Sequence, residues 1–421
     1  MSGDEAVATV VLLGTLDTKR AAYDFFRRRI EAAGCEVTVV DAGVMSGSET
    51  GADVTADEVA RAAGTDRSVL ASAGDRGRAV EAMTRGAVDV VGRLYRRGAF
   101  DAIAGLGGSG GTALISAAMR ALPRGVPKLI VSTKASGDTR PYVGTSDIVM
   151  VNSVVDIDGM NSISERILSN AAAAVAGMAR AATGFRALGP RRPRIGATMS
   201  GVTTPCVTVA RDLLESRGYE VLVFAATGPG GQTMEDLMRD RVISAVLDVT
   251  TTALADELMG SPLATPPDRL ETAGALGLPQ VVSLGALDMV HFGPVETVPH
   301  RFRDRTLYKH NAAVTLMRTS PSECAELGRR IARKLNPARG PVTVFIPLRG
   351  VSMIDVEGGP FYDPVADAAL FDQLKAGLTP DIEVVECDTT INDPAFARAM
   401  ADRLDTYCRA WLPARPREGT P

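Results

Sequence analysis

The sequence has few of the residues that build disulfide frameworks and metal sites. Its five cysteines are scattered and odd in number, and no CxxC pair or Cys/His group has the spacing of zinc ligands. There are only three histidines, and no Ser/His/Asp set of recognisable spacing accompanies them. The cysteine pattern therefore argues against a disulfide-stabilised fold and favours a reducing compartment.

Long apolar runs and excess positive charge are also missing. No segment has the roughly 18 uninterrupted apolar residues of a membrane helix, and the first residues, MSGDEAVATVVLLG, carry acids where a signal peptide needs bases. The formal net charge is −4, and short basic runs such as residues 27–29 are interpreted as solvated faces. We expect a soluble, cytoplasmic protein that binds neither membranes nor nucleic acid.

Alternating strand and helix patterns are what the sequence does contain. Residues 6–14 are a continuous apolar run, residues 20–34 are amphipathic, and residues 35–43 are a second apolar run, which together predict a βαβ unit. The alternation continues with helices expected at about 76–97 and 112–122, and strands expected at 100–107 and 126–133. It predicts parallel sheets covered by helices on both faces.

The length of 421 residues favours two domains, since single cores rarely grow beyond about 250–300 residues. The segment ALGPRRPRIGATMSG is a candidate boundary, which gives domains 1–188 and 189–421. A shift of 184 positions aligns Gly34 with Gly218. One interpretation is an internal duplication; the other is that two βαβ units of similar size align in this way through their shared fold alone. The predicted fold class is α/β, with two Rossmann-like domains and mostly parallel, doubly wound sheets.

The sequence GLGGSGGT, residues 105–112, follows a predicted strand and begins a predicted helix. Glycines there allow positive φ and close backbone approach, and free N–H groups at a helix start favour an anion. It matches GxGxxG, yet the next strand ends in Ser-Thr-Lys without a ribose-binding acid, which disfavours an NAD-linked oxidoreductase. No Walker A lysine follows either. A phosphate site with Ser109 and Thr112 as donors is therefore expected, and a tight turn is the alternative.

Other strand ends carry glycines, hydroxyls and acids. Gly228, Gly230 and Gly231 form a second cluster, interpreted either as an anion site or as a turn or hinge. Because ligands bind at the carboxyl ends of parallel strands, many of these polar residues are expected to face one cleft. Lys19 is a candidate partner for phosphate, and Asp17 is a candidate for Mg²⁺ or for capping the first helix. The remaining strand-end residues are Thr15, Thr18, Thr203, Thr204, Asp248, Thr250, Thr251, Thr252, Gly285 and Asp288.

Few side chains suggest acid–base or nucleophilic catalysis. His310 lies beside Asn311 in a segment interpreted as helical, with Arg318 further along, so either a catalytic role or a histidine held by its neighbour is possible. Cys206 stands near a predicted helix start, where the pKa of a thiol can be lowered, but it has no evident base partner.

Nine ordered motifs between about residues 8 and 405 resemble the Tm-one-like ATP-binding family, which is typified by the N-terminal region of a tomato inhibitor of tobamovirus replication. The motifs are VLLGTLDTK, GLGGSGGTALI, PKLIVSTKASGDTRPYVGTSDI, GVTTPCV, LDVTTTALAD, SLGALDMVHFGP, HNAAVTLMRT, RGVSMIDVEGGPFYDP and INDPAFA.

The resemblance implies two Rossmann-like domains, ATP with Mg²⁺ bound chiefly by the N-terminal domain, and a homo-oligomer, a dimer or higher. In the plant protein a TIM-barrel-like region follows, so a separate TIM-barrel-like partner protein is an expectation here. Asp17 is the implied metal ligand. The nucleotide site implied by the matching motifs comprises Gly14, Thr15, Asp17, Thr18, Lys19, Gly107, Gly108, Ser109, Gly110, Gly111, Thr112, Ser132, Thr133, Ala135, Ser136, Gly137, Thr145 and Asp147.

The preferred functional hypothesis is an ATP-dependent enzyme, of ligase or transferase type, that activates a small carboxylate or carbonyl substrate in the interdomain cleft. A non-catalytic ATP-binding regulator or inhibitor acting through protein contacts is the alternative. In the enzyme hypothesis the candidate catalytic residues are Asp248, Asp288, His310 and Arg318. The candidate substrate-binding residues are Thr203, Thr204, Gly228, Gly230, Gly231, Thr250, Thr251 and Thr252.

Overall fold

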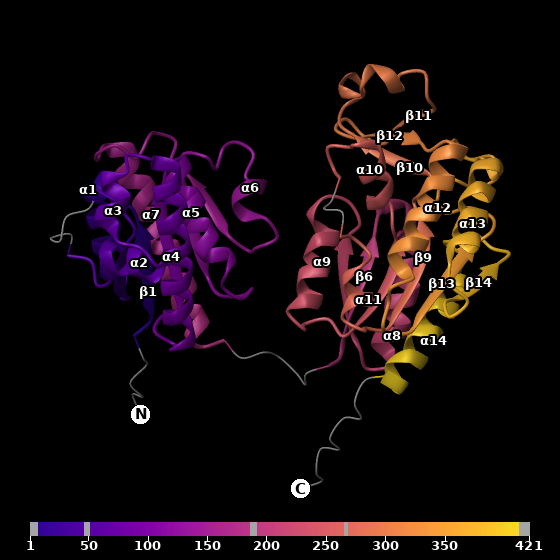
Figure 1. Ribbon diagram of the computed structural model, residues 1–421, viewed down its shortest axis with the longest axis horizontal. Coiled ribbons are helices and arrows are strands. Elements are labelled where there is room, and N and C mark those ends of the chain that lie inside the picture. Colours follow the sequence, from indigo (N-terminus) through magenta and orange to yellow (C-terminus); the bar gives the residue numbers. More distant parts are fainter. Residues whose placement is uncertain (1–6, 46–50, 186–191, 265–267, 412–421) are drawn as a thin grey trace, which may run out of the picture. The chain divides into compact units, whose positions relative to one another are not determined.

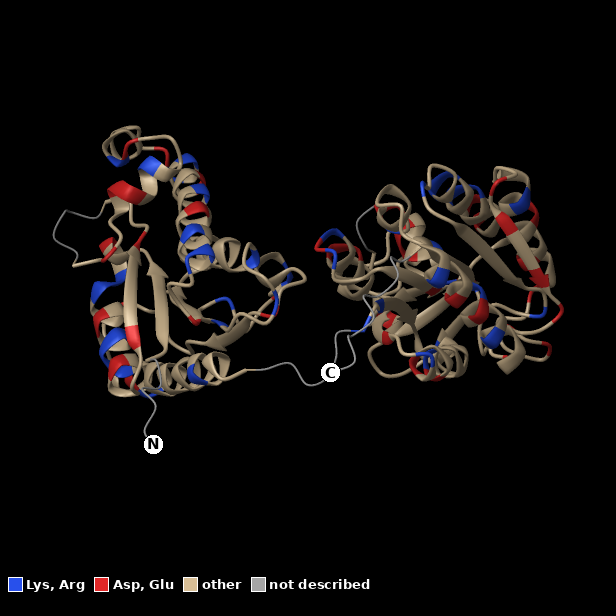
Figure 2. Cartoon of the chain, turned by 90° about the horizontal axis from the view of Figure 1, so that it is seen from below, with Lys and Arg blue, Asp and Glu red and all other residues tan. Residues whose placement is uncertain are grey.

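A computed structural model describes residues 7–45, 51–185, 192–264 and 268–411. The chain divides into two compact units, Met1–Gly189 (unit 1) and Pro190–Pro421 (unit 2) (Figure 1). Basic and acidic residues are interspersed along the helices of each unit (Figure 2), as the near balance of charge in the sequence suggests. Among the described helices, none is long and apolar enough to cross a membrane.

Unit 1 is built on a parallel five-stranded sheet in which β1 lies between β2 and β3. The chain therefore moves outward from β1 in both directions, which makes the carboxyl ends of β1 and β3 a topological switch point. The apolar strand sequences are consistent with burial on both faces. In the order β2-β1-β3-β4-β5, the strands are Glu36–Asp41, Thr9–Gly14, Ala102–Gly107, Lys128–Ser132 and Val149–Asn152.

Helices cover both faces of this sheet. Alternate residues of β1 face opposite sides, so Val10 and Leu12 pack under α1 and α7, whereas Val11 and Leu13 pack under α2, α4 and α5. The helices are α1 (Leu16–Ala32), α2 (Ala56–Ala62), α3 (Arg67–Ser72), α4 (Arg76–Arg96), α5 (Ser109–Arg120), α6 (Arg140–Val143) and α7 (Ser162–Thr183).

Unit 2 contains a parallel six-stranded sheet of order β14-β13-β9-β8-β6-β7 and a three-stranded antiparallel sheet of order β10-β12-β11. The parallel strands are β6 (Arg194–Met199), β7 (Glu220–Ala225), β8 (Ala245–Thr250), β9 (Gln280–Gly285), β13 (Val342–Pro347) and β14 (Glu383–Cys387). The antiparallel strands are β10 (Met289–Phe292), β11 (Leu307–Lys309) and β12 (Thr315–Arg318).

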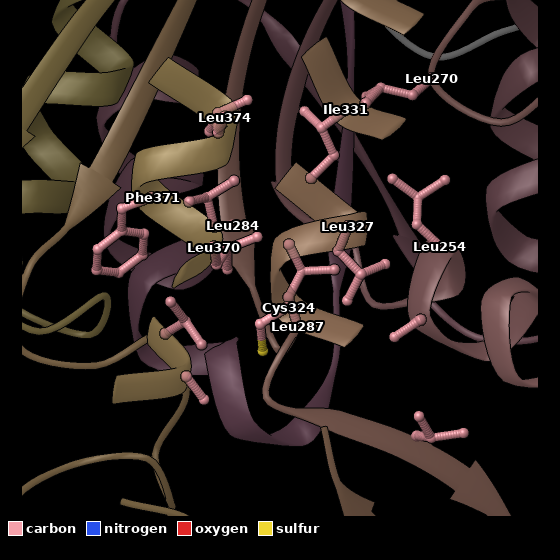
Figure 3. Close-up of a cluster of buried hydrophobic side chains, with 14 of the residues drawn as sticks. Leu254, Leu270, Leu284, Leu287, Cys324, Leu327, Ile331, Leu370, Phe371 and Leu374 are labelled. Atoms are coloured by element: carbon pink, nitrogen blue, oxygen red, sulfur yellow. The ribbon is translucent and has the colours of Figure 1, made fainter. Parts of the chain in front are cut away.

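The largest core cluster of unit 2 forms where α12 and α13 pack on β9 and β13 (Figure 3). Leu327, Leu370 and Leu284 meet there, while α8 and α14 cover the other face. The helices are α8 (Thr204–Ser216), α9 (Pro229–Arg239), α10 (Ala253–Met259), α11 (Thr272–Ala275), α12 (Pro321–Leu335), α13 (Pro364–Gly377) and α14 (Pro394–Trp411), with 3-10 helices at Gly201–Thr203, Val295–Thr297 and His300–Phe302.

The predicted α/β class with two mostly parallel, doubly wound sheets is confirmed. Both large sheets begin with the same pattern, because β6 lies between β7 and β8 as β1 lies between β2 and β3. Gly34 and Gly218, which the proposed duplication aligns, both follow the first helix of their unit at positive φ. The prediction of a helix around His310 is wrong. Residues 307–309 and 315–318 form the antiparallel strands β11 and β12, and β12 also pairs with β10.

Candidate functional site

A cavity of about 720 Å³ opens in unit 1 at the switch point. It is lined by the β1–α1 and β3–α5 loops, by residues that follow β2, β4 and β5, and by α3 and α4. This volume is within the usual range of a small-molecule or cofactor site. Of the nucleotide residues expected from the sequence, it brings together Thr15, Asp17, Thr18, Lys19, Gly108, Ser109, Gly110, Gly111 and Thr133.

Three glycines at the start of α5 face this cavity. Gly108 is the N-cap residue, and no side chain caps the first turn. A Cβ built on Gly110 would meet no atom within 4 Å, and one on Gly111 would make only ordinary contact, the nearest atom being Leu106 O at 3.7 Å. The expected positive φ is wrong for this loop, since none of its glycines adopts it. Neither backbone conformation nor packing therefore requires glycine at positions 110 and 111.

The other glycines of these motifs serve packing. A Cβ on Gly14 would lie 1.8 Å from the hydroxyl of Tyr23, which accepts a hydrogen bond from the Leu106 N–H at 2.8 Å. A Cβ on Gly107 would lie 2.5 Å from the Thr112 nitrogen. Gly14 and Gly107 thus allow β1, β3 and their helices to approach closely, and they shape the wall behind the cavity.

Asp17 lies in the first turn of α1 and ties a neighbouring loop to it. Its Oδ2 accepts a hydrogen bond from the Met45 N–H at 3.0 Å, whereas its buried Oδ1 has no partner among the described residues. The N-cap position belongs to Thr15, so the capping interpretation of Asp17 is wrong. The described residues contain no group of three or more His, Cys, Asp or Glu that could hold a metal. Mg²⁺ at Asp17 would need phosphate and water oxygens as its remaining ligands, which is how proteins usually hold this ion.

One side of the cavity is polar. Lys19 interrupts α1 with non-helical φ and ψ of −133° and 23°, and its ammonium donates to the carbonyl of Ile157, in the loop after β5, at 2.6 Å. Thr133 and Lys134, after β4, and Asp156 line the same region. We call Lys19, Thr133, Lys134 and Asp156 the polar side.

The opposite side is formed largely by hydrocarbon. It comes from the residues after β2 and from α3, α4 and α5, with Arg76 and Asp75 at the start of α4 as its charged edge. Such a wall excludes water and suits the flat face of a base or another apolar group. We call it the apolar side; its side chains are those of Ala42, Val44, Met45, Leu70, Ala71, Ala79, Val80, Met83 and Leu114.

Some expected nucleotide residues lie elsewhere. Ser132 and Thr112 are buried and share a hydrogen bond of 2.7 Å behind the cavity, and Ala135, Ser136 and Gly137 are not among its lining residues. The prediction that Thr145 and Asp147 belong to the nucleotide site is wrong. Both residues precede β5, so they lie at the amino edge of the sheet, away from the cavity. There Asp147 accepts hydrogen bonds from Lys128 at 2.7 Å and from the Gly125 N–H, and Thr145 bonds Arg124.

In unit 2 the strand-end hydroxyls are used within the fold. The Thr203 and Thr250 hydroxyls lie 2.8 Å apart, and the Thr250 N–H donates to Thr198, whose hydroxyl donates to Asp248 at 2.6 Å. Thr251 and Thr252 bond backbone carbonyls and are buried, while Thr204 bonds Ser200 O. The structure gives these threonines internal partners in place of the expected substrate.

Asp248 belongs to a buried ion-pair network. Both of its oxygens accept hydrogen bonds from Arg269 at 2.6 Å, and Arg269 also reaches Glu235 at 3.3 Å. Burial would lower the pKa of the guanidinium, but the charges of Asp248 and Glu235 outweigh it and raise the pKa. The candidate catalytic role of Asp248 is therefore not favoured, because a salt bridge sealed from solvent holds it.

The second glycine cluster is explained by backbone and packing. Gly228 has φ of 63°, a Cβ on Gly230 would lie 2.2 Å from Ala225 O, and one on Gly231 would lie 2.9 Å from Arg269. A turn that requires glycine was the second of the two interpretations drawn from the sequence, and the structure favours it over an anion site.

Asp288 and Arg318 do come together, with two carboxylates that the sequence analysis missed. Arg318 donates to Asp367 at 2.7 Å and to Asp355 at 3.4 Å, and Ser352 donates to Asp288 at 2.8 Å. Burial, together with the charge of Asp355, raises the pKa of Asp288 to about 8 and that of Asp367 to about 7. We call Asp288, Arg318, Asp355 and Asp367 the acid cluster.

The last two candidates lie apart from these groups. His310 is exposed at the β11–β12 turn, where its backbone N–H bonds Val314 O, and it faces none of the described clusters. Cys206 is buried, and that burial raises the pKa of its thiol to about 12, which is opposite to the shift a nucleophile needs.

Sequence reasoning missed Arg76, Lys134 and Asp156, which line the cavity, and the apolar side. Lys134 and Asp156 follow β4 and β5, so the rule that ligands bind at strand carboxyl ends points to them. Arg76 and the apolar side come from helices with no local motif, and only their packing over the sheet identifies them.

Comparisons with known proteins identify close relatives. The two domain models of the uncharacterised protein family UPF0261 match residues 8–184 (N-terminal domain) and 192–408 (C-terminal domain). A UPF0261 protein of Clostridium tetani is 50% identical over 396 residues, 94% of this chain and 98% of that protein. The ToMV resistance protein Tm-1(GCR237) of Solanum lycopersicum is 46% identical over 305 residues, which are 71% of this chain and 40% of the tomato protein. The resemblance to the Tm-one-like family is confirmed.

Similarity to solved structures is weak. UDP-N-acetylglucosamine 2-epimerase from Rickettsia bellii is 11% identical, covers 65% of this chain and 78% of its own, and has a TM-score of 0.22. A likeness at this level says nothing about function.

Proposed function

This chain belongs to the uncharacterised protein family UPF0261, and we propose that it binds a phosphorylated nucleotide, ATP, in the cavity of unit 1. The supporting observation is the uncapped start of α5. Gly110 and Gly111 leave its backbone N–H groups open to the cavity although neither packing nor φ requires a glycine there. Free N–H groups and the positive end of the helix dipole together favour a phosphate.

The rest of the cavity fits the parts of a nucleotide. The apolar side offers hydrocarbon for the base, while Lys19 supplies positive charge close to the helix start. Asp17 offers an oxygen without a partner to Mg²⁺, which when bound would offset phosphate charge. A homo-oligomer and a separate TIM-barrel-like partner remain proposals.

The finer proposal is that ATP is used to activate a small carboxylate or carbonyl substrate. Its support is the polar side, where charged side chains stand beyond the phosphate-binding turn. A non-catalytic ATP-binding regulator is the second candidate, because the expected acceptor residues of unit 2 are occupied by internal hydrogen bonds. Long incubation separates the two: a regulator leaves ATP intact in the presence of every candidate acid, whereas the enzyme releases ADP or AMP with one of them.

Calorimetric titration with ATP and Mg²⁺ tests the site. In Gly110→Ala/Gly111→Ala two methyl groups enter the cavity without a clash in the free protein, so the variant folds but phosphate approach is obstructed. We expect ATP affinity to fall at least tenfold, about 1.4 kcal/mol.

Gly177→Ala is the matched control. Gly177 lies in α7 with no atom within 4 Å of an added Cβ, so the same chemical change is made in a helix that does not line the cavity. Both variants gain helix propensity, so their melting temperatures should not fall. Unchanged ATP affinity in the double variant would contradict the proposed site.

A further inference from the structure

The cavity of unit 1 is chemically two-sided, and its asymmetry sets the direction of a bound nucleotide. The apolar side is the one part of the lining that suits a base, and it lies with β2, α3 and α4. The polar side lies with the loops after β4 and β5, beyond the start of α5. A nucleotide with its base on the apolar side therefore directs its terminal phosphate toward the polar side.

Within the polar side, positive charge exceeds negative charge. Lys19 and Lys134 give two positive charges against the single carboxylate of Asp156, whose Oδ1 already accepts the Ile157 N–H at 2.8 Å. Lys134 is exposed and makes no side-chain hydrogen bond or ion pair with any described residue. Thr133 Oγ1 would lie 3.9 Å from a Cβ on Gly108, so the residue preceding Lys134 is directly beside the phosphate turn.

We infer that the polar side is an acceptor subsite that binds a second, small carboxylate substrate, held by Lys134 and the Thr133 hydroxyl next to the terminal phosphate of ATP. The inference rests on the proposed ATP site and locates the acceptor within unit 1. A carboxylate suits a lysine ammonium and a hydroxyl because both donate charge-assisted hydrogen bonds to it.

The reaction that follows is phosphoryl transfer. One oxygen of the carboxylate attacks the γ-phosphorus, the bond from that phosphorus to the β,γ-bridging oxygen breaks, and its electron pair leaves with ADP. The product is an acyl phosphate, and no proton moves because the acceptor is already ionised. Lys19, fixed by Ile157, would offset charge on the transferring group.

The test uses the full chain with ATP and Mg²⁺, and acetate, malonate, succinate and benzoate as probes. ADP release and trapping of the acyl phosphate as a hydroxamate with hydroxylamine are measured together, with inorganic phosphate as a separate arm. We expect at least one acid to raise ADP release tenfold or more over the acid-free rate, with hydroxamate formed in equal amount. No response to any acid, or a response to inorganic phosphate alone, overturns the carboxylate subsite.

Lys134→Met removes the charge at similar side-chain length, and Lys309→Met makes the same change at an exposed lysine of unit 2. We expect the acid-dependent rate to fall at least tenfold in Lys134→Met, to recover partly in Lys134→Arg and to be unchanged in Lys309→Met, with ATP affinity within twofold of wild type in all three. Equal loss of ATP affinity in Lys134→Met would make Lys134 a phosphate ligand and overturn the subsite. Failure of the wild type to bind ATP would instead contradict the proposed function.

Discussion

At the scale of single residues, charge burial separates structural groups from candidate functional ones. Arg269 is sealed between Asp248 and Glu235, whereas Lys134 faces the cavity without a partner among the described residues. A buried ion pair is costly to break because the remaining charge has lost both water and its partner. A charge at a cavity edge can be removed with little effect on the fold.

We therefore predict that Arg269→Met destabilises unit 2 by about 3–5 kcal/mol, since two buried carboxylates lose their counter-charge. Trp411 is the only tryptophan and lies in α14, so its fluorescence during urea unfolding reports on unit 2. Arg211→Met, which breaks a largely exposed pair with Asp212 in α8 of the same unit, is the control and should cost no more than about 1 kcal/mol. Similar losses of unfolding free energy in the two variants would show that the buried ion pairs of Arg269 do not stabilise unit 2 more than an exposed pair does.

At the scale of elements, the acid cluster joins four segments of unit 2. Asp288 follows β9, Arg318 ends β12, Asp355 lies in the loop before α13 and Asp367 lies on α13. The neighbouring Thr319 and Cys324 also contact Arg318. Burial disfavours the charged form of Asp288, and the nearby charge of Asp355 disfavours it further. Both raise the pKa of Asp288, although the positive charge of Arg318 opposes the shift.

This arrangement predicts that unit 2 loses stability as the pH rises. A carboxyl group whose pKa is about 8 in the folded state and about 4 when unfolded binds more protons in the folded state between those values. The stabilisation that this carboxyl group gives to the folded state is complete below pH 4 and is lost as the pH rises through 8. Between these values the free energy of unfolding falls by up to about 1.4 kcal/mol per pH unit. Urea midpoints from Trp411 fluorescence at pH 6, 7 and 8 measure it.

Asp288→Asn should make that profile less steep, because the amide cannot ionise yet can keep the bond from Ser352. The slope that remains belongs to Asp367, whose pKa is about 7. Asp304→Asn, at an exposed position of the same unit, should leave the profile unchanged. A profile equally steep in wild type and Asp288→Asn would show that the proton lost between pH 6 and 8 comes from another group.

At the scale of the whole molecule, every lining residue of the cavity belongs to unit 1. We predict that ATP with Mg²⁺ slows hydrogen exchange in the β1–α1 loop, the first turn of α5 and the residues after β4, and leaves the peptides of unit 2 unchanged. Mass spectrometry of the full chain measures this by peptide. Protection confined to the loops that follow β6, β8 or β9 would contradict the location of the site.

The sequence alone determined the features that depend on local pattern. Continuous apolar runs identified the parallel strands, and glycines at a strand–helix junction identified residues 107–112, because strand burial and helix starts depend on neighbouring residues. Nine short motifs were enough to indicate the family.

Only the tertiary structure decided which of these residues meet. Gly110 and Gly111 differ from Gly107 in what surrounds them, Arg269 reaches Asp248 across 21 positions, and Asp147 lies at the amino edge of its sheet. Such partners are set by strand order and by helix packing over the sheet. Strand order and helix packing bring segments together that are distant in the sequence, so the neighbours of a residue along the chain do not reveal its partners in the fold.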